Sequence, residues 1–383
     1  MKQIRQFLDH LLDTSTPERP AWNKEALRED HQPKWNYIDG CMIKAVLEMY
    51  EVTKNDKYLS FADIFIDYYI KEDGSILGYD AEELNCDNIN EGKVLFGLYG
   101  LTGKGKYRRA IDLLYSQLQQ QPRTESGNFW HKKIYPNQIW LDGLYMVQPF
   151  YMKYEVAFHQ NKNYRDVFSQ FQNVYKLMRD DKTGLFYHGY DEARTCFWSD
   201  KETGLSKNFW TRSLGWYAMA LVDTLEVMDE QFFYEYETMQ QYLKGVLDAL
   251  LEFADEETGM FYQVTDMEGV KGNYLETSGT CAIAYALMKG ARLGFLPQDY
   301  YTFGEEIFTA VKKYKLVQRE GVLGLKDICL VAGLGGMPGK GDYKLRDGSY
   351  EYYISEPVVD DDAKGVAPFL FAFAEKYRNK GEV

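Results

Sequence analysis

The sequence predicts an all-α protein, an (α/α)6 barrel of six helical hairpins with an inner and an outer ring of helices. Apolar residues recur with the 3.6-residue period of helices along most of the chain, and no long stretch alternates as a strand does. The helical segments also fall into pairs, in which an amphipathic segment with a charged face precedes a more uniformly apolar one. Such pairs favour polar helices outside and apolar helices inside.

The helices of each pair can be placed by number. The amphipathic outer segments are expected at about 2–14, 55–72, 104–121, 163–179, 231–254 and 298–315. The apolar inner segments are expected at about 38–53, 88–101, 139–159, 210–228, 276–293 and 361–378. Because the pairs follow one another along the whole chain, one domain is expected over residues 1–383. Pro149 should kink the third inner helix, because proline removes a backbone donor.

A short turn motif recurs between the outer and the inner helix of three pairs. Its pattern, x-[Ser/Thr]-Gly-x-Phe-aromatic-[His/Gln], occurs at Glu125–His131, Lys182–His188 and Glu257–Gln263. The glycines of the motif should adopt positive φ, as turn positions do. Three copies at the same place in the hairpin support a structural repeat.

Composition limits the kind of partner. The formal net charge of −14 argues against nucleic acid and anionic membranes, which need a basic face. No run of 18 apolar residues offers a membrane span. Aromatic residues make up 16% of the chain, with 32 Tyr and 7 Trp, and rings with polar tips suit stacking on sugars. Carbohydrate is therefore the expected ligand class.

The cysteines and the N-terminus predict the compartment. The five cysteines are scattered singly without a CxxC pair, which is typical of free thiols in a reducing compartment and not of disulfides or a zinc cluster. The first 20 residues carry acidic groups inside their apolar pattern, unlike a signal peptide. A cytoplasmic location is expected, and no metal site is predicted.

One carboxylate stands out because it interrupts an apolar run. Asp142 lies in IWLDGLYMVQPF (residues 139–150), where apolar residues cover nearly every face of a helix. Burying a carboxylate costs several kcal/mol unless it is hydrogen-bonded, paired or protonated. Asp142 is thus a candidate general acid, and the alternative is an N-terminal helix cap or a satisfied core acid.

Polar residues gather at the starts of all the inner helices. In a closed ring of hairpins these starts lie at one end of the barrel and should converge on one pocket. The residues concerned are Asp39, Asp87, Asn88, Asn90, Asp142, Trp210, Arg212, Trp216, Glu276, Ser278, Glu356 and 360–362. Capping explains the short polar residues, but it does not explain the two tryptophans and the arginine.

Six motifs in order resemble a known family. They are CDNINEGK (86–93), IWLDGLYM (139–146), GLFYHGYD (184–191), FWTRSLGW (209–216), NYLETSGT (273–280) and GSYEYYISEPVVDDDAKG (348–365). Together they resemble the unsaturated rhamnogalacturonyl hydrolases of glycoside hydrolase family 105 and, more distantly, the unsaturated glucuronyl hydrolases of family 88. The resemblance implies an (α/α)6 barrel, in agreement with the hairpin count.

The resemblance also implies a reaction and its residues. The substrate is a lyase product of pectin rhamnogalacturonan with a 4,5-unsaturated galacturonic or glucuronic acid at its non-reducing end. Hydration of the C4=C5 bond gives a hemiketal that opens and releases the adjacent sugar, without a cofactor or metal. Asp142 is the implied general acid/base, Asp87 a second essential acid and His188 the third catalytic residue. The implied substrate-binding residues are Trp35, Tyr37, Asn90, Lys132, Trp210, Arg212 and Trp216.

Several alternatives remain at this stage. A conventional inverting glycosidase would use Asp142 as acid and Asp87 as base on a saturated glycoside. The protein could also be an unsaturated glucuronyl hydrolase acting on other polysaccharide fragments, an epimerase that depends on His131 and His188, or a helical-repeat binding protein without catalysis. Arg212 either grips a substrate carboxylate or braces the pocket by pairing with Asp87 or Asp142.

Overall fold

The computed structural model describes residues 2–29, 32–228, 232–319, 321–336 and 345–379. Helices dominate this part of the chain, and each expected hairpin is present. The outer helices are α1 (Lys2–Asp13), α4 (Asp56–Tyr69), α6 (Gly105–Gln120), α8 (Tyr164–Met178), α10 (Phe233–Leu251) and α12 (Asp299–Tyr314). The inner helices are α3 (Tyr37–Thr53), α5 (Lys93–Thr102), α7 (Leu141–Phe158), α9 (Thr211–Val227), α11 (Thr277–Arg292) and α14 (Ala363–Asn379).

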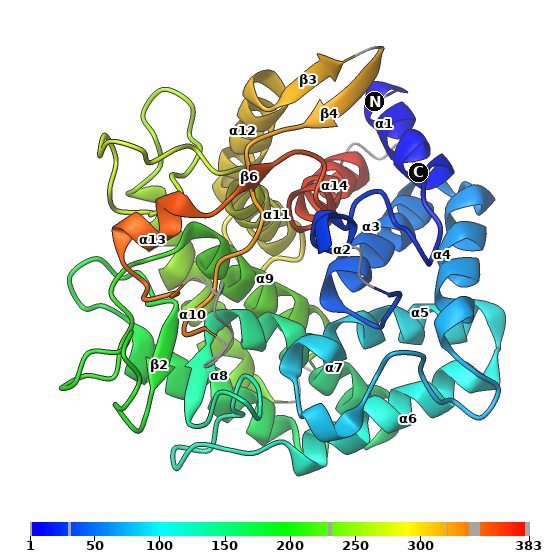
Figure 1. Ribbon diagram of the computed structural model, residues 1–383, viewed down its shortest axis with the longest axis horizontal. Helices are drawn as coiled ribbons and strands as arrows, with labels where there is room; N and C mark the ends of the chain where they lie inside the picture. Colours follow the sequence, from blue (N-terminus) through cyan, green and yellow to red (C-terminus); the bar gives the residue numbers. More distant parts are fainter. Residues whose placement is uncertain (1, 30–31, 229–231, 320, 337–344, 380–383) are drawn as a thin grey trace.

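The inner helices form a ring. Going round it, α3 contacts the short helix η2 (Cys86–Gly92) just before α5, η2 contacts α7, and the contacts continue through α9, α11 and α14 back to α3. Figure 1 shows this arrangement, with the blue N-terminal and red C-terminal helices side by side. Arg5 of α1 donates a 2.8 Å hydrogen bond to the hydroxyl of Tyr377 in α14, which ties the two ends of the chain together. The predicted helical barrel is confirmed.

The structure departs from the expected elements in a few places. The second inner helix begins as a 3-10 turn, η2, because Asn85 accepts the backbone N–H of Asp87 and starts a tight turn there. Two short helices, α2 (Lys24–Glu29) and α13 (Tyr350–Ser355), were not expected, since six residues are too few to show a helical period. Residue 231, the expected start of the fifth outer helix, lies outside the described residues.

The third inner helix, α7, runs through Pro149 to Phe158. The expected kink at this proline stays a prediction. No helix in the described ranges is long and apolar enough to cross a membrane.

The repeated turns precede inner helices, and the first two are followed by the short strands β1 and β2. Gly127, Gly184 and Gly259 have φ values of +100°, +75° and +69°, so the expected left-handed turns are confirmed. The six strands of the described residues pair antiparallel as β1 with β2, β3 with β4 and β5 with β6. They are β1 (Gln138–Trp140), β2 (Gly189–Asp191), β3 (Leu316–Arg319), β4 (Val322–Leu325), β5 (Ile328–Cys329) and β6 (Val358–Val359).

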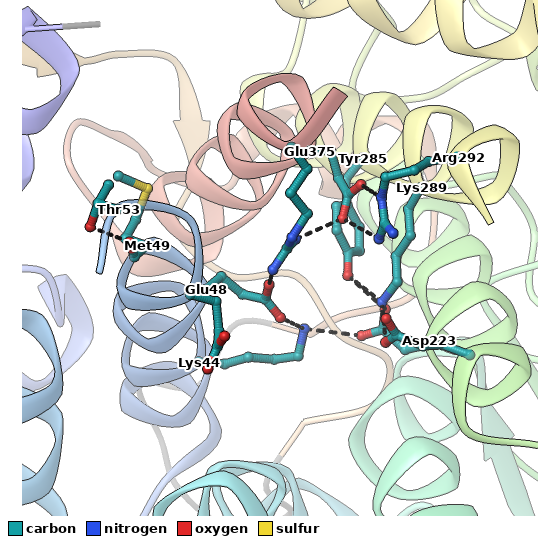
Figure 2. A network of polar contacts seen from close by, with 12 residues as sticks. Lys44, Glu48, Met49, Thr53, Asp223, Tyr285, Lys289, Arg292 and Glu375 are labelled. Atoms are coloured by element: carbon teal, nitrogen blue, oxygen red, sulfur yellow. Dashed lines mark hydrogen bonds and ion pairs between the residues drawn. The ribbon is translucent and has the colours of Figure 1, made fainter. Parts of the chain in front are cut away.

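One end of the barrel holds a network of charged side chains. Figure 2 shows this network, which joins α3, α9, α11 and α14 near their C-terminal ends. Asp223 of α9 accepts a 2.6 Å hydrogen bond from Lys289 of α11 and lies 3.2 Å from the ammonium of Lys44 in α3. Lys289 and Asp223 are both buried. The two ends of the barrel therefore differ in chemistry as well as in backbone structure.

Candidate active site

Asp142 lies in the first turn of α7, at the end of the barrel that carries the turns. The residue at the N-cap is Trp140, which makes no capping hydrogen bond, so Asp142 is not the helix cap. The Asp142 side chain is 14% exposed, and its Oδ2 lies 3.2 Å from Nε2 of His188, whose side chain is buried. The carboxylate therefore reaches solvent on one side and faces an imidazole on the other.

Strand pairing brings Asp142 and His188 together. Trp140 at the end of β1 is opposite Gly189 at the start of β2, and the N–H of Leu141 donates to the carbonyl of His188 at 3.1 Å. A Cβ at position 189 would lie 2.4 Å from Cδ1 of Leu334, so a larger residue there would require the Leu334 side chain to move. The strand after the first repeated turn thus meets the end of the second turn, His188, although the two turns are distant in sequence.

The imidazole of His188 is held from behind by Tyr353 of α13. The phenol oxygen lies 2.8 Å from Nδ1 of His188. Burial, followed by the charge of Asp142, raises the pKa of Tyr353 well above its usual value, so the phenol keeps its proton. A protonated phenol can donate to Nδ1 or accept from it, and in the tautomer in which it donates, the imidazole hydrogen lies on Nε2, 3.2 Å from Asp142. Sequence reasoning assigned no role to Tyr353, although the residue lies in the last of the six motifs.

Asp87 is held as an anion by a neighbouring lysine. Lys132 Nζ lies 2.6 Å from one carboxylate oxygen of Asp87, and Nε2 of His131 lies 3.6 Å from the other. An antiparallel bridge between Asn85 and Lys132 brings these segments together. Burial by itself would raise the pKa of Asp87, but the charge of Lys132, its hydrogen bond and the charges of other neighbours together outweigh burial and hold that pKa below its usual value.

An open cleft of about 940 Å³ adjoins these residues: Lys132, the partner of Asp87, and Trp140 line it, whereas Asp87, Asp142 and His188 are not among its lining residues. Its walls include Tyr37, Lys132, Tyr135 and Trp140. The rings of Tyr135 and Trp140 are stacked, with centroids 5.1 Å apart and planes 16° apart. This pair of aromatic side chains was missed by sequence reasoning, although Trp140 lies only two residues from Asp142. A cleft that combines aromatic faces with charged groups suits a sugar with a carboxylate.

The comparison with known proteins identifies the family. Residues 13–380 match the model of Glycosyl Hydrolase Family 88. The chain belongs to this family. It is also similar to a family 105 glycoside hydrolase of C. acetobutylicum ATCC 824, with 41% identity over 98% of this chain and 99% of that chain and a TM-score of 0.87. The protein is therefore a glycoside hydrolase.

Two further relatives are more distant. The unsaturated rhamnogalacturonyl hydrolase YesR of Bacillus subtilis is 26% identical over 68% of this chain and 72% of that protein. The unsaturated glucuronyl hydrolase of Bacillus sp. GL1, described as responsible for the degradation of glycosaminoglycan, shares the fold at 13% identity, with a TM-score of 0.64 over 91% of this chain and 87% of that chain. The expected resemblance to families 105 and 88 is confirmed.

Of four residues expected to bind substrate in this hydrolase, two line the cleft and two lie behind it. Tyr37 and Lys132 line the cleft. Trp35 and Asn90 lie behind it: the Trp35 indole donates to the carbonyl of Asn88 at 2.8 Å, and the Asn90 amide donates to the carbonyl of Tyr37 at 3.0 Å. Trp35 and Asn90 thus hold the backbone of cleft residues in place.

Arg212 of the hydrolase is 2% exposed and stacks on Trp210, with its guanidinium carbon 4.7 Å from the ring centroid. It donates to the carbonyl of Cys329 and, at 3.3 Å, to the hydroxyl of Ser278. Neither Asp87 nor Asp142 lies within salt-bridge distance of it in the described structure, so the alternative of an ion pair with those acids is wrong. Arg212 instead braces the segment after β5, which forms part of the cleft wall.

The two tryptophans of the same motif lie at different depths. Trp210 is near the catalytic centre, with its ring centroid 4.8 Å from that of His188. Trp216 is 1% exposed and stacks on Tyr145 inside the barrel, with ring centroids 4.8 Å apart. Trp216 is absent from the residues that line the cleft. Trp210 is likewise 1% exposed and absent from the cleft lining, so it packs against His188, while Trp216 packs against Tyr145.

Proposed function

We propose that this glycoside hydrolase hydrates the C4=C5 double bond of a 4,5-unsaturated uronic acid at the non-reducing end of an oligosaccharide. The observation that carries the proposal is the contrast between the partners of two carboxylates, Asp87 and Asp142. Asp87 is paired with a lysine at 2.6 Å, whereas Asp142 faces only the imidazole of His188. Asp142 is therefore the group suited to give up and regain a proton.

The reaction needs one such group. Asp142 in its acid form donates its proton to C4 of the vinyl ether, and positive charge develops at C5 and the ring oxygen. Water then adds to C5 and gives its proton to the Asp142 carboxylate, which restores the acid. The C5 hemiketal opens to a ketone, and the hemiacetal left at C1 collapses and releases the neighbouring sugar. No covalent enzyme intermediate is required.

The neighbouring groups stabilise this cycle. Nε2–H of His188 lies against Asp142 and can stabilise its carboxylate after the proton has left. The fixed negative charge of Asp87 favours the positive charge that develops on the sugar ring. The stacked rings of Tyr135 and Trp140 offer an apolar face to the sugar in the cleft.

We further propose rhamnogalacturonan fragments as the substrate class. The support is the 41% identity to a family 105 enzyme and the similarity to a named unsaturated rhamnogalacturonyl hydrolase. Fragments that carry an unsaturated glucuronic acid on other sugars are the closest competing substrates.

Ultraviolet absorbance tests the proposal. The unsaturated uronide is a conjugated chromophore, which hydration destroys and simple hydrolysis leaves intact. Purified protein is incubated with unsaturated disaccharides made by rhamnogalacturonan, pectate and glycosaminoglycan lyases, with Asp142→Asn as the inactive control. We expect the largest loss of absorbance with the rhamnogalacturonan product. Release of sugar without loss of absorbance would instead indicate an inverting glycosidase.

A further inference from the structure

A small cavity of about 10 Å³ lies beside His131, inside the wall of the barrel. It is lined by residues of the first repeated turn, of α7 and of α8, among them His131, Gly143, Gln148 and Gln170. A volume of this size accommodates roughly one water molecule. The cavity is separate from the open cleft. His131, Gln148 and Gln170 have no role in the proposed reaction.

Three residues around this cavity each have a buried polar atom that makes no hydrogen bond within the described chain. The atoms are Nδ1 of His131, Oε1 of Gln148 and Nε2 of Gln170. Gln148 Nε2 donates to Gln170 Oε1 at 3.1 Å, and His131 Nε2 lies 3.6 Å from the Asp87 carboxylate. Buried polar atoms are nearly always hydrogen-bonded in proteins, directly or through ordered water.

We propose that this cavity binds one ordered water molecule, which sets the tautomer of His131 and thereby positions Asp87. The water accepts a hydrogen bond from Gln170 Nε2 and donates to Gln148 Oε1 and to His131 Nδ1. Because Nδ1 then accepts, the imidazole hydrogen lies on Nε2 and faces the Asp87 carboxylate. Gln148 and Gln170 are positioning residues that act on Asp87 through His131.

The surroundings of His131 fit this role. Its ring stacks on Trp140, with centroids 4.4 Å apart and planes 19° apart, which fixes the plane of the imidazole. A Cβ at position 143 would lie 3.0 Å from Nδ1, so the glycine keeps that nitrogen accessible. Burial lowers the pKa of His131 to about 4, against the opposing charge of Asp87. A neutral imidazole carries a single N–H, and its neighbours decide which nitrogen holds it.

Two measurements on the unaltered protein test the water and the tautomer directly. A high-resolution crystal structure should show density for one water within hydrogen-bond distance of Gln148, Gln170 and His131. Nitrogen NMR of protein labelled at histidine, with His131 assigned from the His131→Asn variant, should show the hydrogen on Nε2. A dry cavity, or a hydrogen on Nδ1, overturns the proposal. Neither measurement depends on the proposed reaction.

A variant tests the effect on Asp87, and this part rests on the proposed function. Gln148→Met keeps the size of the side chain but removes the acceptor, so kcat/KM should fall by about 5- to 10-fold, the effect of one hydrogen bond. The acid limb of its pH profile should move to higher pH, because Asp87 loses the Nε2–H that favours its ionised form. A merely structural role of Gln148 would lower the melting temperature and leave the pH profile unchanged, and that result overturns the proposal.

Thr224→Val is the matched control. Thr224 also has a buried hydroxyl without a hydrogen-bond partner in the described chain, but it lies near the far end of α9 and away from the cavity. The Thr224→Val variant should keep the kcat/KM and the pH profile of the wild type. If the control shifts the acid limb as Gln148→Met does, the effect is not specific to the cavity and the proposal fails.

Discussion

Two carboxylates at opposite ends of the barrel, Asp223 and Asp142, have partners of different kinds. At the far end, Asp223 lies between the ammonium groups of Lys289 and Lys44, at 2.6 and 3.2 Å. At the cleft end, Asp142 lies 3.2 Å from His188 and within salt-bridge distance of no lysine or arginine in the described residues. A lysine stays charged at neutral pH, whereas an imidazole can gain or lose a proton.

This difference distinguishes a structural acid from the proposed general acid in the same fold. Burial opposes ionisation of Asp223, but Lys289 and Lys44 hold its pKa far below the usual value, so it cannot exchange protons near neutral pH. Glu375 of α14 is likewise fully buried and paired with Arg292 and Arg378. Asp223 and Glu375 therefore have permanent cations as partners, whereas Asp142 has an imidazole. Five predictions follow from this difference, in order of decreasing effect.

Asp142→Asn should abolish turnover. The amide is nearly isosteric but has no acidic proton, so the rate should fall by at least about 10²- to 10⁴-fold. Loss of ultraviolet absorbance with the unsaturated disaccharide measures the rate, and the melting temperature checks the fold. A variant with near-wild-type activity would show that the proton is carried by another group.

Asp223→Asn should act on stability instead. It leaves the buried Lys289 and the partly exposed Lys44 without their shared carboxylate, which costs about 3–5 kcal/mol of unfolding free energy. Urea unfolding measures the loss, and kcat/KM at a temperature where the variant is folded should equal that of the wild type. Glu51→Gln is the control, because the Glu51–Lys54 pair is about half exposed and such pairs contribute about 0–1 kcal/mol. A fall in kcat/KM with unchanged stability would contradict the division between the two ends.

Arg212→Lys should lower both stability and activity moderately. Lysine keeps the charge but cannot reach the Cys329 carbonyl and the Ser278 hydroxyl at once, so the loss should be about 1.5–3 kcal/mol of stability. kcat/KM should fall less, because Arg212 supports the cleft wall and is itself buried. An unchanged melting temperature with a large rise in KM would instead indicate that the guanidinium grips the substrate.

Glu48→Gln should change how stability depends on pH. Burial alone would raise the pKa of Glu48, but Lys44 and Arg378 lower it to about 2. An unfolded glutamate has a pKa of about 4.3. The stabilisation is therefore present above about pH 4 and is lost as the pH falls towards 2. Melting temperatures between pH 2 and 6 should fall less steeply in the variant, and identical slopes would exclude this role of Glu48.

Exhaustive chelation should leave the activity unchanged, the smallest of these effects. The proposed reaction uses a carboxylate, an imidazole and water, and the described residues include no group of three or more His, Cys, Asp or Glu that could hold a metal ion. Activity is measured before and after treatment with a chelator, at constant ionic strength. Activity that disappears and returns with a divalent cation would contradict the prediction.

The sequence by itself determined the helices, the turns and the motifs. A helical period and a glycine turn are local patterns, and both depend on residues that are neighbours in the chain. This is why the twelve helices and the left-handed turns at Gly127, Gly184 and Gly259 were predicted close to their observed positions. Local patterns failed where an element was short or began with a 3-10 turn, as in α13 and η2.

Only the tertiary structure decided which side chains meet. His188 contacts Tyr353, which is 165 residues away, through strand pairing and helix packing that no local pattern encodes. The tertiary structure also decided how deep in the barrel a side chain lies. Trp210 and Trp216 share one motif, but six residues of α-helix span about 9 Å. The Trp210 ring therefore lies beside His188, and the Trp216 ring lies beside Tyr145. The sequence contained the reactive residue types, and packing determined their partners.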